Sequence, residues 1–215
     1  FNQLGIVART DRSGLIAAER ELDGLRQGRA AIAADLQAQE ELLQLELVQV
    51  SSLEIWDRVS IWQLANHDFK IDPSPGHTTP NRFLEPLQGA VLTQGFGPTT
   101  AWFEPPYAGS AHFHTGIDLS AAWGTPIHAA DDGVVLFTGN DGYGYGNYVV
   151  LGHSGGLVTL YGHLASIAVK QGDQVRQGDV VGAEGSTGNS TGAHLHFELR
   201  VDGTPTDPRP LFTGA

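Results

Sequence analysis

The sequence predicts a mainly β C-terminal domain, built as a compact antiparallel β-sheet, that follows an N-terminal α-helical coiled-coil segment. Glycine is rare in residues 1–70, which hold four of the 28 glycines, and dense in the remaining 145 residues, which hold 24. Apolar residues recur at helical spacing in the first region and gather in short runs bounded by glycine after it. We therefore expect a helical segment over 1–70, a linker over 71–88 and a β-domain over 89–215.

The helical segment carries apolar residues in steps of three, four or seven, which is typical of the a/d seam of a coiled coil. The seam comprises Leu15, Ala18, Leu22, Leu25, Ile32, Leu36, Leu43, Leu47, Val50 and Leu53. Arg29 and Gln39 interrupt it, so we expect imperfect pairing. Such a stripe usually packs on a partner helix. It therefore favours a spacer or a helical hairpin arm over a dedicated recognition helix. The partner is left open between a second copy, an upstream segment and the globular domain.

The linker and the β-domain are predicted from proline, glycine and apolar runs. Prolines block both helices and central strands, and the linker contains Pro73, Pro75, Pro80 and Pro86. Three apolar runs after it predict strands, at 134–137, 148–151 and 157–161. Glycine-rich stretches separate these runs, as expected for hairpin turns of an antiparallel sheet. Two near-identical stretches, 171–173 and 177–179, predict turns on either side of a short strand.

Composition excludes several functional classes. Twelve basic and 24 acidic residues give a net charge of −12, whereas a nucleic-acid binder needs a basic surface. The chain has no Cys, so a transition metal would have to be held by His and carboxylate ligands. No stretch is long and apolar enough to predict a membrane segment. The chain also has no Met, so we expect an upstream segment, such as a signal peptide or a membrane anchor.

Seven of the nine histidines follow the linker, and four of these seven fall into three clusters. His114 and Asp118 share one face of a strand but lie about 13 Å apart on an ideal one. Gly116 between them permits the bend or bulge that one ion would require. Their nitrogen and oxygen atoms both suit zinc.

The second cluster is the pair His194 and His196, which share a strand face with Leu195 on the opposite, buried side. Two solvated histidines are the simplest alternative, but this spacing favours a metal, an acid or a substrate as their partner. His163 forms the third cluster with Tyr161. It indicates a functional site only in combination with the other two clusters. A catalytic zinc needs three protein ligands and an open position. His114, Asp118 and one of His194 and His196 meet that count.

These motifs resemble those of the lysostaphin-type (LytM-type) zinc peptidases. The resemblance covers residues 89–212 and rests on the pair His114 and Asp118, the stretch 161–164 and the triplet 194–196. Further similar stretches are 95–97, 132–135, 144–147 and 185–188. The family fold implied is a compact antiparallel β-domain whose groove is floored by a sheet and walled by loops.

The resemblance implies residue roles and a substrate. His114, Asp118 and His196 would hold one Zn²⁺ ion, and His163 and His194 would be the catalytic pair, with the general base undecided between them. The implied activity is metalloendopeptidase cleavage of bacterial peptidoglycan, at the stem peptide or the cross-bridge, outside the cytoplasm. Tyr107 and Tyr145 are predicted substrate contacts. The alternative is a non-catalytic cell-wall scaffold or hydrolase activator that works through its coiled coil, but none of the five key residues is substituted.

Overall fold

The computed structural model of the chain describes residues 2–65 and 82–212, so the predicted linker prolines at 73, 75 and 80 lie outside the described residues. The chain divides into two compact units, residues 1–43 and 44–215. Among the described residues, no helix is long and apolar enough to cross a membrane.

A single helix, α1 (Asn2–Ala65), forms the N-terminal region and confirms the predicted helical segment. The seam side chains that the structure describes as large and exposed are 47% to 66% accessible: Leu15, Leu22, Leu25, Ile32, Leu36, Leu43, Val50 and Leu53. Because these side chains face solvent in the single chain, pairing of the helix as a coiled coil stays a prediction.

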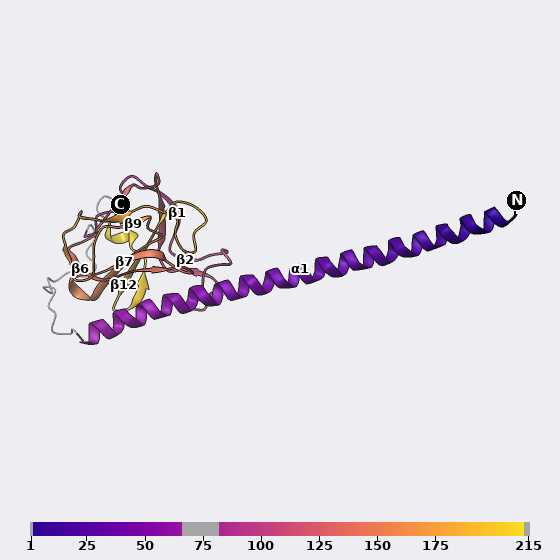
Figure 1. Cartoon of the computed structure of the whole chain (residues 1–215). Coiled ribbons are helices and arrows are strands. Elements are labelled where there is room, and N and C mark those ends of the chain that lie inside the picture. Colours follow the sequence, from indigo (N-terminus) through magenta and orange to yellow (C-terminus); the bar gives the residue numbers. More distant parts are fainter. Residues whose placement is uncertain (1, 66–81, 213–215) are drawn as a thin grey trace. The chain divides into compact units, whose positions relative to one another are not determined.

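The rest of the chain is mainly β-structure (Figure 1). The strands are β1 (Val91–Gln94), β2 (Gly97–Pro98), β3 (Phe113–His114), β4 (Ile117–Ser120), β5 (Pro126–His128), β6 (Gly133–Asp141), β7 (Gly146–Gly152), β8 (Leu157–Gly162), β9 (Ser166–Ile167), β10 (Gln174–Val175), β11 (Val180–Ala183), β12 (Leu195–Val201) and β13 (Thr204–Thr206). Two short 3₁₀ helices, Ser154–Gly156 and Arg209–Leu211, complete it. The predicted strands fall within β6, β7 and β8, and the two predicted turns flank β10, which confirms these predictions.

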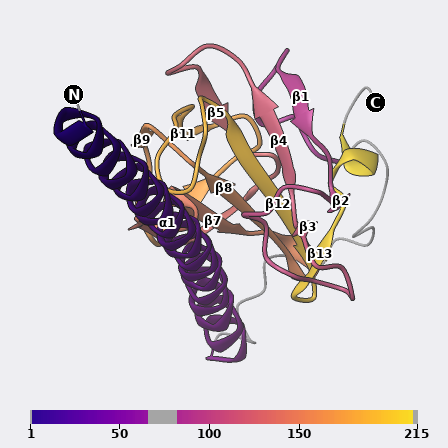
Figure 2. The same cartoon turned by 90° about the vertical axis from the view of Figure 1, so that its right-hand side faces the viewer.

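The main sheet has the strand order β1-β4-β12-β8-β7-β6-β10, and β13 pairs with β12. Smaller sheets contain β5-β11-β9 and β2-β3. Each of the ten strand pairings in the described part of the chain is antiparallel. Strand β12 therefore lies between β4 and β8 (Figure 2), and this placement brings together residues that are about 80 positions apart.

The main core lies on one face of the central strands. Leu195, Phe197 and Leu199 of β12 are fully buried there, as is Tyr161 of β8. Phe83, from the end of the region predicted as linker, packs into the same core together with Leu87. The alternation along β12 leaves His196 and Glu198 on the opposite face, where the functional site forms.

A second core covers the opposite face of β6, β7 and β8. Ile55, Trp56 and Val59 of α1 are buried against strand residues that include Val150 and Leu160. Burial on both faces explains why these strands read as continuous apolar runs rather than as alternating ones. The packed face of α1 differs from the predicted seam, whose nearest members, at 50 and 53, stay exposed.

Candidate metal centre

The junction between β3 and β4 places the first two site residues. His114 ends β3 and Asp118 lies in β4, and both side chains are buried. The chain breaks its strand geometry at Gly116, where an added Cβ would lie 2.5 Å from the carbonyl oxygen of Phe197 and 3.0 Å from His196 Cε1. Only a residue without a side chain permits this close approach to β12, as the sequence predicted for a bend at this position.

Strand β12 supplies the third residue by its register. His196 pairs with Asp118 of β4 on one side and with Gly162 of β8 on the other. His163 follows Gly162 directly, and His194 precedes β12 and forms an isolated bridge with Gly185. The five predicted site residues therefore come together where β4, β12 and β8 lie side by side, next to the end of β3.

Three ligand atoms converge on one point. His114 Nε2 lies 3.2 Å from Asp118 Oδ1 and 3.0 Å from His196 Nδ1, and His196 Nδ1 lies 3.0 Å from Asp118 Oδ1. Zinc ligands at about 2.0–2.2 Å from a tetrahedral ion lie a little over 3 Å from one another. The two imidazoles and the carboxylate thus fit a zinc ion in chemistry and in spacing, and they form a candidate metal site.

The charges around these atoms favour a cation. Burial alone would raise the pKa of Asp118, but hydrogen bonds to His114 and His196 outweigh it and lower that pKa well below its usual value. Burial opposes a charge on His196 too, yet Asp118 and Glu198 raise its pKa to about 10. Positive charge is therefore stabilised where the three ligand atoms meet.

His163 and His194 lie beside this point, with ring centroids 4.7 Å apart. His194 Nε2 is 3.8 Å from Asp118 Oδ1. His163 Nδ1 hydrogen-bonds the carbonyl oxygen of Thr187 at 2.8 Å, and His194 Nδ1 bonds that of Gly192 at 2.8 Å. Because carbonyl oxygens only accept, both Nδ1 atoms carry a proton, and both Nε2 atoms are left as proton acceptors.

His163 is held neutral in a strained backbone conformation. Burial is the largest cause, followed by the nearby His196 and His194, and together they lower the pKa of His163 to about 3. Its φ angle of 61° lies in the left-handed region, which residues other than glycine seldom adopt. Such strain is found where the surrounding structure fixes a side chain for a task.

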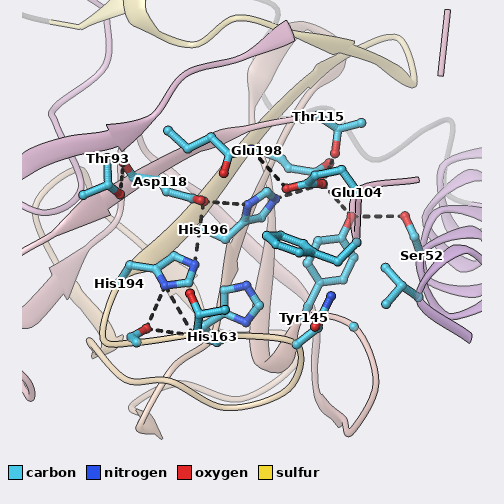
Figure 3. Close-up of a pocket in the computed structure, with 18 of the residues that line it drawn as sticks. Ser52, Thr93, Glu104, Thr115, Asp118, Tyr145, His163, His194, His196 and Glu198 are labelled. Atoms are coloured by element: carbon cyan, nitrogen blue, oxygen red, sulfur yellow. Dashed lines mark hydrogen bonds and ion pairs between the residues drawn. The ribbon is translucent and has the colours of Figure 1, made fainter. Parts of the chain in front are cut away.

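A groove of about 310 Å³ is lined by four of the five residues, Asp118, His163, His194 and His196. Its walls come from β1, from the loop between β2 and β3, from the loop that precedes β12, and from Val48 and Ser52 of α1 (Figure 3). Glu104 lies in this groove with Oε1 3.8 Å from His114 Nε2, and burial raises the pKa of its carboxyl group. The cavity therefore combines acidic side chains with imidazoles that accept protons.

The two predicted tyrosine contacts lie in different surroundings. Tyr145 lines the groove, and its hydroxyl group is bonded to Glu198. Tyr107 is 37% exposed, its ring packs against Phe113, and it is not among the groove-lining residues that the structure describes. Contact of either tyrosine with substrate stays a prediction.

Two further site residues escaped the sequence interpretation. Glu198 lies two residues after His196, so the period of a strand places both on the same face, and this spacing was a usable signal. Thr187 orients His163 through a backbone oxygen, which no side-chain pattern reveals. Its glycine-flanked loop packs on the β6–β7 hairpin, where a Cβ on Gly188 would clash with Gly146.

Comparison with known proteins places this site in a family. Residues 112–208 match the family model "Peptidase family M23". Over 94 residues the chain is 46% identical to "Peptidoglycan DD-endopeptidase ShyA" of Vibrio cholerae, a match that covers 44% of this chain and 22% of that protein. The chain spans less than a third of the length of the first curated relatives that it matches.

Two solved structures share the fold of the β-domain. A zinc-containing peptidase from Vibrio cholerae is 35% identical with a TM-score of 0.51, over 60% of this chain and 38% of that one. The catalytic domain of the antimicrobial peptidase lysostaphin from Staphylococcus simulans is 34% identical with a TM-score of 0.50, over 58% of this chain and 92% of that one.

Proposed function

Because the chain belongs to peptidase family M23, we propose that it is a zinc-dependent endopeptidase that hydrolyses peptide bonds in bacterial peptidoglycan. The observation that carries the proposal is the convergence of His114 Nε2, Asp118 Oδ1 and His196 Nδ1, each 3.0 to 3.2 Å from the others, beneath a groove. The name of the relative from Vibrio cholerae supports the substrate class, and the name of the lysostaphin domain supports peptidase activity.

The ligand set supports a catalytic rather than a structural ion. A structural zinc site is closed by four protein ligands, whereas the residues described here supply three at one point. When bound, zinc would act as a Lewis acid on the scissile carbonyl group and would lower the pKa of the attacking water. One Zn²⁺ ion is therefore the proposed cofactor.

His163 and His194 provide the proton transfers in this proposal. Both rings present Nε2 as an acceptor, since both Nδ1 atoms donate to backbone carbonyl oxygens. One ring takes a proton from the attacking water, and the pair then stabilises the oxyanion and returns the proton to the leaving amine. The low pKa of His163 keeps it neutral at pH 7, as such a role requires. Which ring acts as the general base is left open.

The intact site argues against the non-catalytic alternative. A scaffold or a hydrolase activator has no need for a complete ligand set beside two oriented imidazoles. All five residues are present: Asp118, His163, His194 and His196 line one groove, and the buried His114 meets Asp118 and His196 at its base. We also propose that the chain acts where peptidoglycan lies, in the cell wall or the periplasm, and Tyr107 and Tyr145 remain candidate substrate contacts.

Digestion of purified peptidoglycan tests this function. Sacculi that differ in cross-bridge type are incubated with the full chain, with and without a chelator, and new amino termini are labelled and identified. We expect soluble fragments with new amino termini that a chelator abolishes and added Zn²⁺ restores. His128→Ala is the matched control, since this histidine lies outside the groove and bonds Gly178. Fragment release that survives complete removal of zinc would refute the proposal.

A further inference from the structure

The imidazole of His196 is held from the side opposite the metal site. Its Nε2 lies 3.2 Å from Oε1 of Glu198, whose side chain is fully buried. A carboxylate only accepts hydrogen bonds, so Nε2 carries a proton, and Nδ1 is the nitrogen whose lone pair would bind a metal at the ligand point. A carboxylate behind a metal-binding histidine fixes the tautomer and the orientation of the ring.

Glu198 is itself fixed by three further donors. Tyr145 Oη donates to Oε1 at 2.5 Å, and Thr115 Oγ1 donates to the same oxygen at 2.7 Å. Arg200 Nε donates to Oε2 at 3.2 Å. These three donors give the carboxylate behind His196 one orientation.

Helix α1 provides the remaining partners of the Tyr145 hydroxyl group. Because that hydroxyl donates its proton to Glu198, it accepts from Ser52 Oγ at 3.1 Å and from Trp56 Nε1 at 3.4 Å. Figure 3 shows Ser52 directed at Tyr145 from the helix. The Arg200 guanidinium also lies 3.7 Å from the centroid of the Trp56 ring. Both groups that hold Glu198 from this side thus touch the helix.

We propose that Glu198 and Tyr145 position the metal ligand His196, and that α1 completes this arrangement by holding the Tyr145 hydroxyl group with Ser52. The chain of contacts runs from the helix to the ligand atom without a gap. A phenylalanine would fill the space of the Tyr145 ring equally well, so the buried hydroxyl group is explained by its hydrogen bonds. This inference rests on the proposed zinc site, and it makes the second half of α1 a part of that site.

The test measures metal binding and does not depend on turnover. Zinc affinity of the full chain is determined by competition with a chromophoric chelator, and the Co²⁺-substituted protein is examined by visible absorption. We expect Tyr145→Phe to weaken zinc binding about tenfold to a hundredfold, the usual effect of removing such an outer partner, and to change the Co²⁺ spectrum. Ser52→Ala should weaken binding less, and it should add nothing in a Tyr145→Phe background.

Ser51→Ala is the matched control. Ser51 Oγ donates to Asp141 at 2.8 Å, so it contributes a helix-to-sheet hydrogen bond that lies outside the chain leading to His196. Zinc affinity and the Co²⁺ spectrum should be those of the unmodified protein in this variant. Unchanged affinity and spectrum in Tyr145→Phe would overturn the inference, as would equal losses in Ser51→Ala and Ser52→Ala. Failure of the unmodified chain to bind zinc would instead refute the proposed function itself.

Discussion

At the scale of single residues, the four site histidines each commit one ring nitrogen to a fixed acceptor. His114 Nδ1 donates to the carbonyl oxygen of Gly95 at 3.0 Å, and His196 Nε2 faces Glu198. His163 and His194 use backbone carbonyl oxygens in the same way. Each ring therefore offers one defined nitrogen to the groove, for a metal ion or for a proton.

The different roles proposed for these rings predict a separation between metal binding and turnover. In His163→Ala we expect activity on peptidoglycan to fall at least a hundredfold, because a positioned acid or base contributes about 10²- to 10⁴-fold. Bound zinc, measured by atomic absorption after dialysis, should stay at one ion per chain. His114→Ala should lose metal and activity together, and loss of metal in His163→Ala would show that its assigned role is wrong.

A buried histidine outside the groove predicts how stability changes with pH. His153 Nδ1 bonds the carbonyl oxygen of Asp132 and its Nε2 bonds Thr159, and burial lowers the pKa of this ring. The unfolded chain therefore binds a proton that the folded chain does not between the lowered pKa and the usual value near 6.5. This contribution to stability is complete above about pH 6.5 and is lost as the pH falls.

We expect the free energy of unfolding of His153→Gln to fall less steeply with decreasing pH than that of the unmodified chain. The difference should be up to about 1.4 kcal/mol per pH unit below pH 6.5. The measurement is urea unfolding of metal-free protein at several pH values, with and without the substitution. His163 has a lowered pKa in both proteins, so its effect cancels in the difference. Parallel stability curves over this pH range would contradict the assignment of a neutral His153.

The sequence predicted which side chains form the site but not how their rings are held. The alternation of a strand and the position of Gly116 predicted that His114, Asp118 and one of His194 and His196 meet, and only the family resemblance selected His196. The ring orientations depend on backbone oxygens at Gly95, Thr187 and Gly192. Loops bring these oxygens to the site, and because every residue type has a backbone oxygen, the sequence does not predict them. Only Glu198 left a pattern, since it follows the histidines at strand spacing.

At the scale of elements, the approach of the β3–β4 junction to β12 sets the distances between the ligand atoms. We expect Gly116→Ala to lower the free energy of unfolding by about 1–3 kcal/mol, the usual cost of forcing atoms into a packed site, since the new Cβ meets Phe197 O at 2.5 Å. Zinc affinity should fall as well, because His114 and Asp118 flank this position. Urea unfolding and chelator competition measure the two effects.

Gly142→Ala is the control for that substitution. Its Cβ would meet nothing within 4 Å, and this glycine has no positive φ. Stability and metal affinity should therefore change little. Equal behaviour of the Gly116 and Gly142 variants would contradict the close approach described between the junction and β12.

For helix α1, the sequence pattern predicted the helix but not which of its faces is buried. The heptad steps predicted a helix and one apolar stripe, and the helix is present. Its buried contacts instead use Ile55, Trp56 and Val59, which lie on another face. Both faces of the last turns carry apolar residues, and the sheet that selects one of them is formed by strands about 80 to 100 positions later. The partner of the exposed stripe stays a prediction that is open between a second copy, an upstream segment and the globular domain.

At the scale of the whole molecule, metal binding should stabilise the fold, because the ligand atoms meet only when β4 and β12 are paired. Free Zn²⁺ at a hundred times its dissociation constant should add about 2.7 kcal/mol to the free energy of unfolding. Thermal unfolding with zinc and with a chelator measures this as a rise in Tm. His114→Ala should show almost none of that rise, and an equal rise there would place the ion elsewhere.

Direct location of the ion tests the central claim that three side chains from strands far apart in the sequence bind one Zn²⁺. Crystals of the zinc-loaded chain would be measured on both sides of the zinc absorption edge. We predict a single anomalous peak within about 2.0–2.2 Å of His114 Nε2, an Asp118 carboxylate oxygen and His196 Nδ1. A peak bound by other residues, or side chains that lie apart around an empty position in fully loaded protein, would contradict the account.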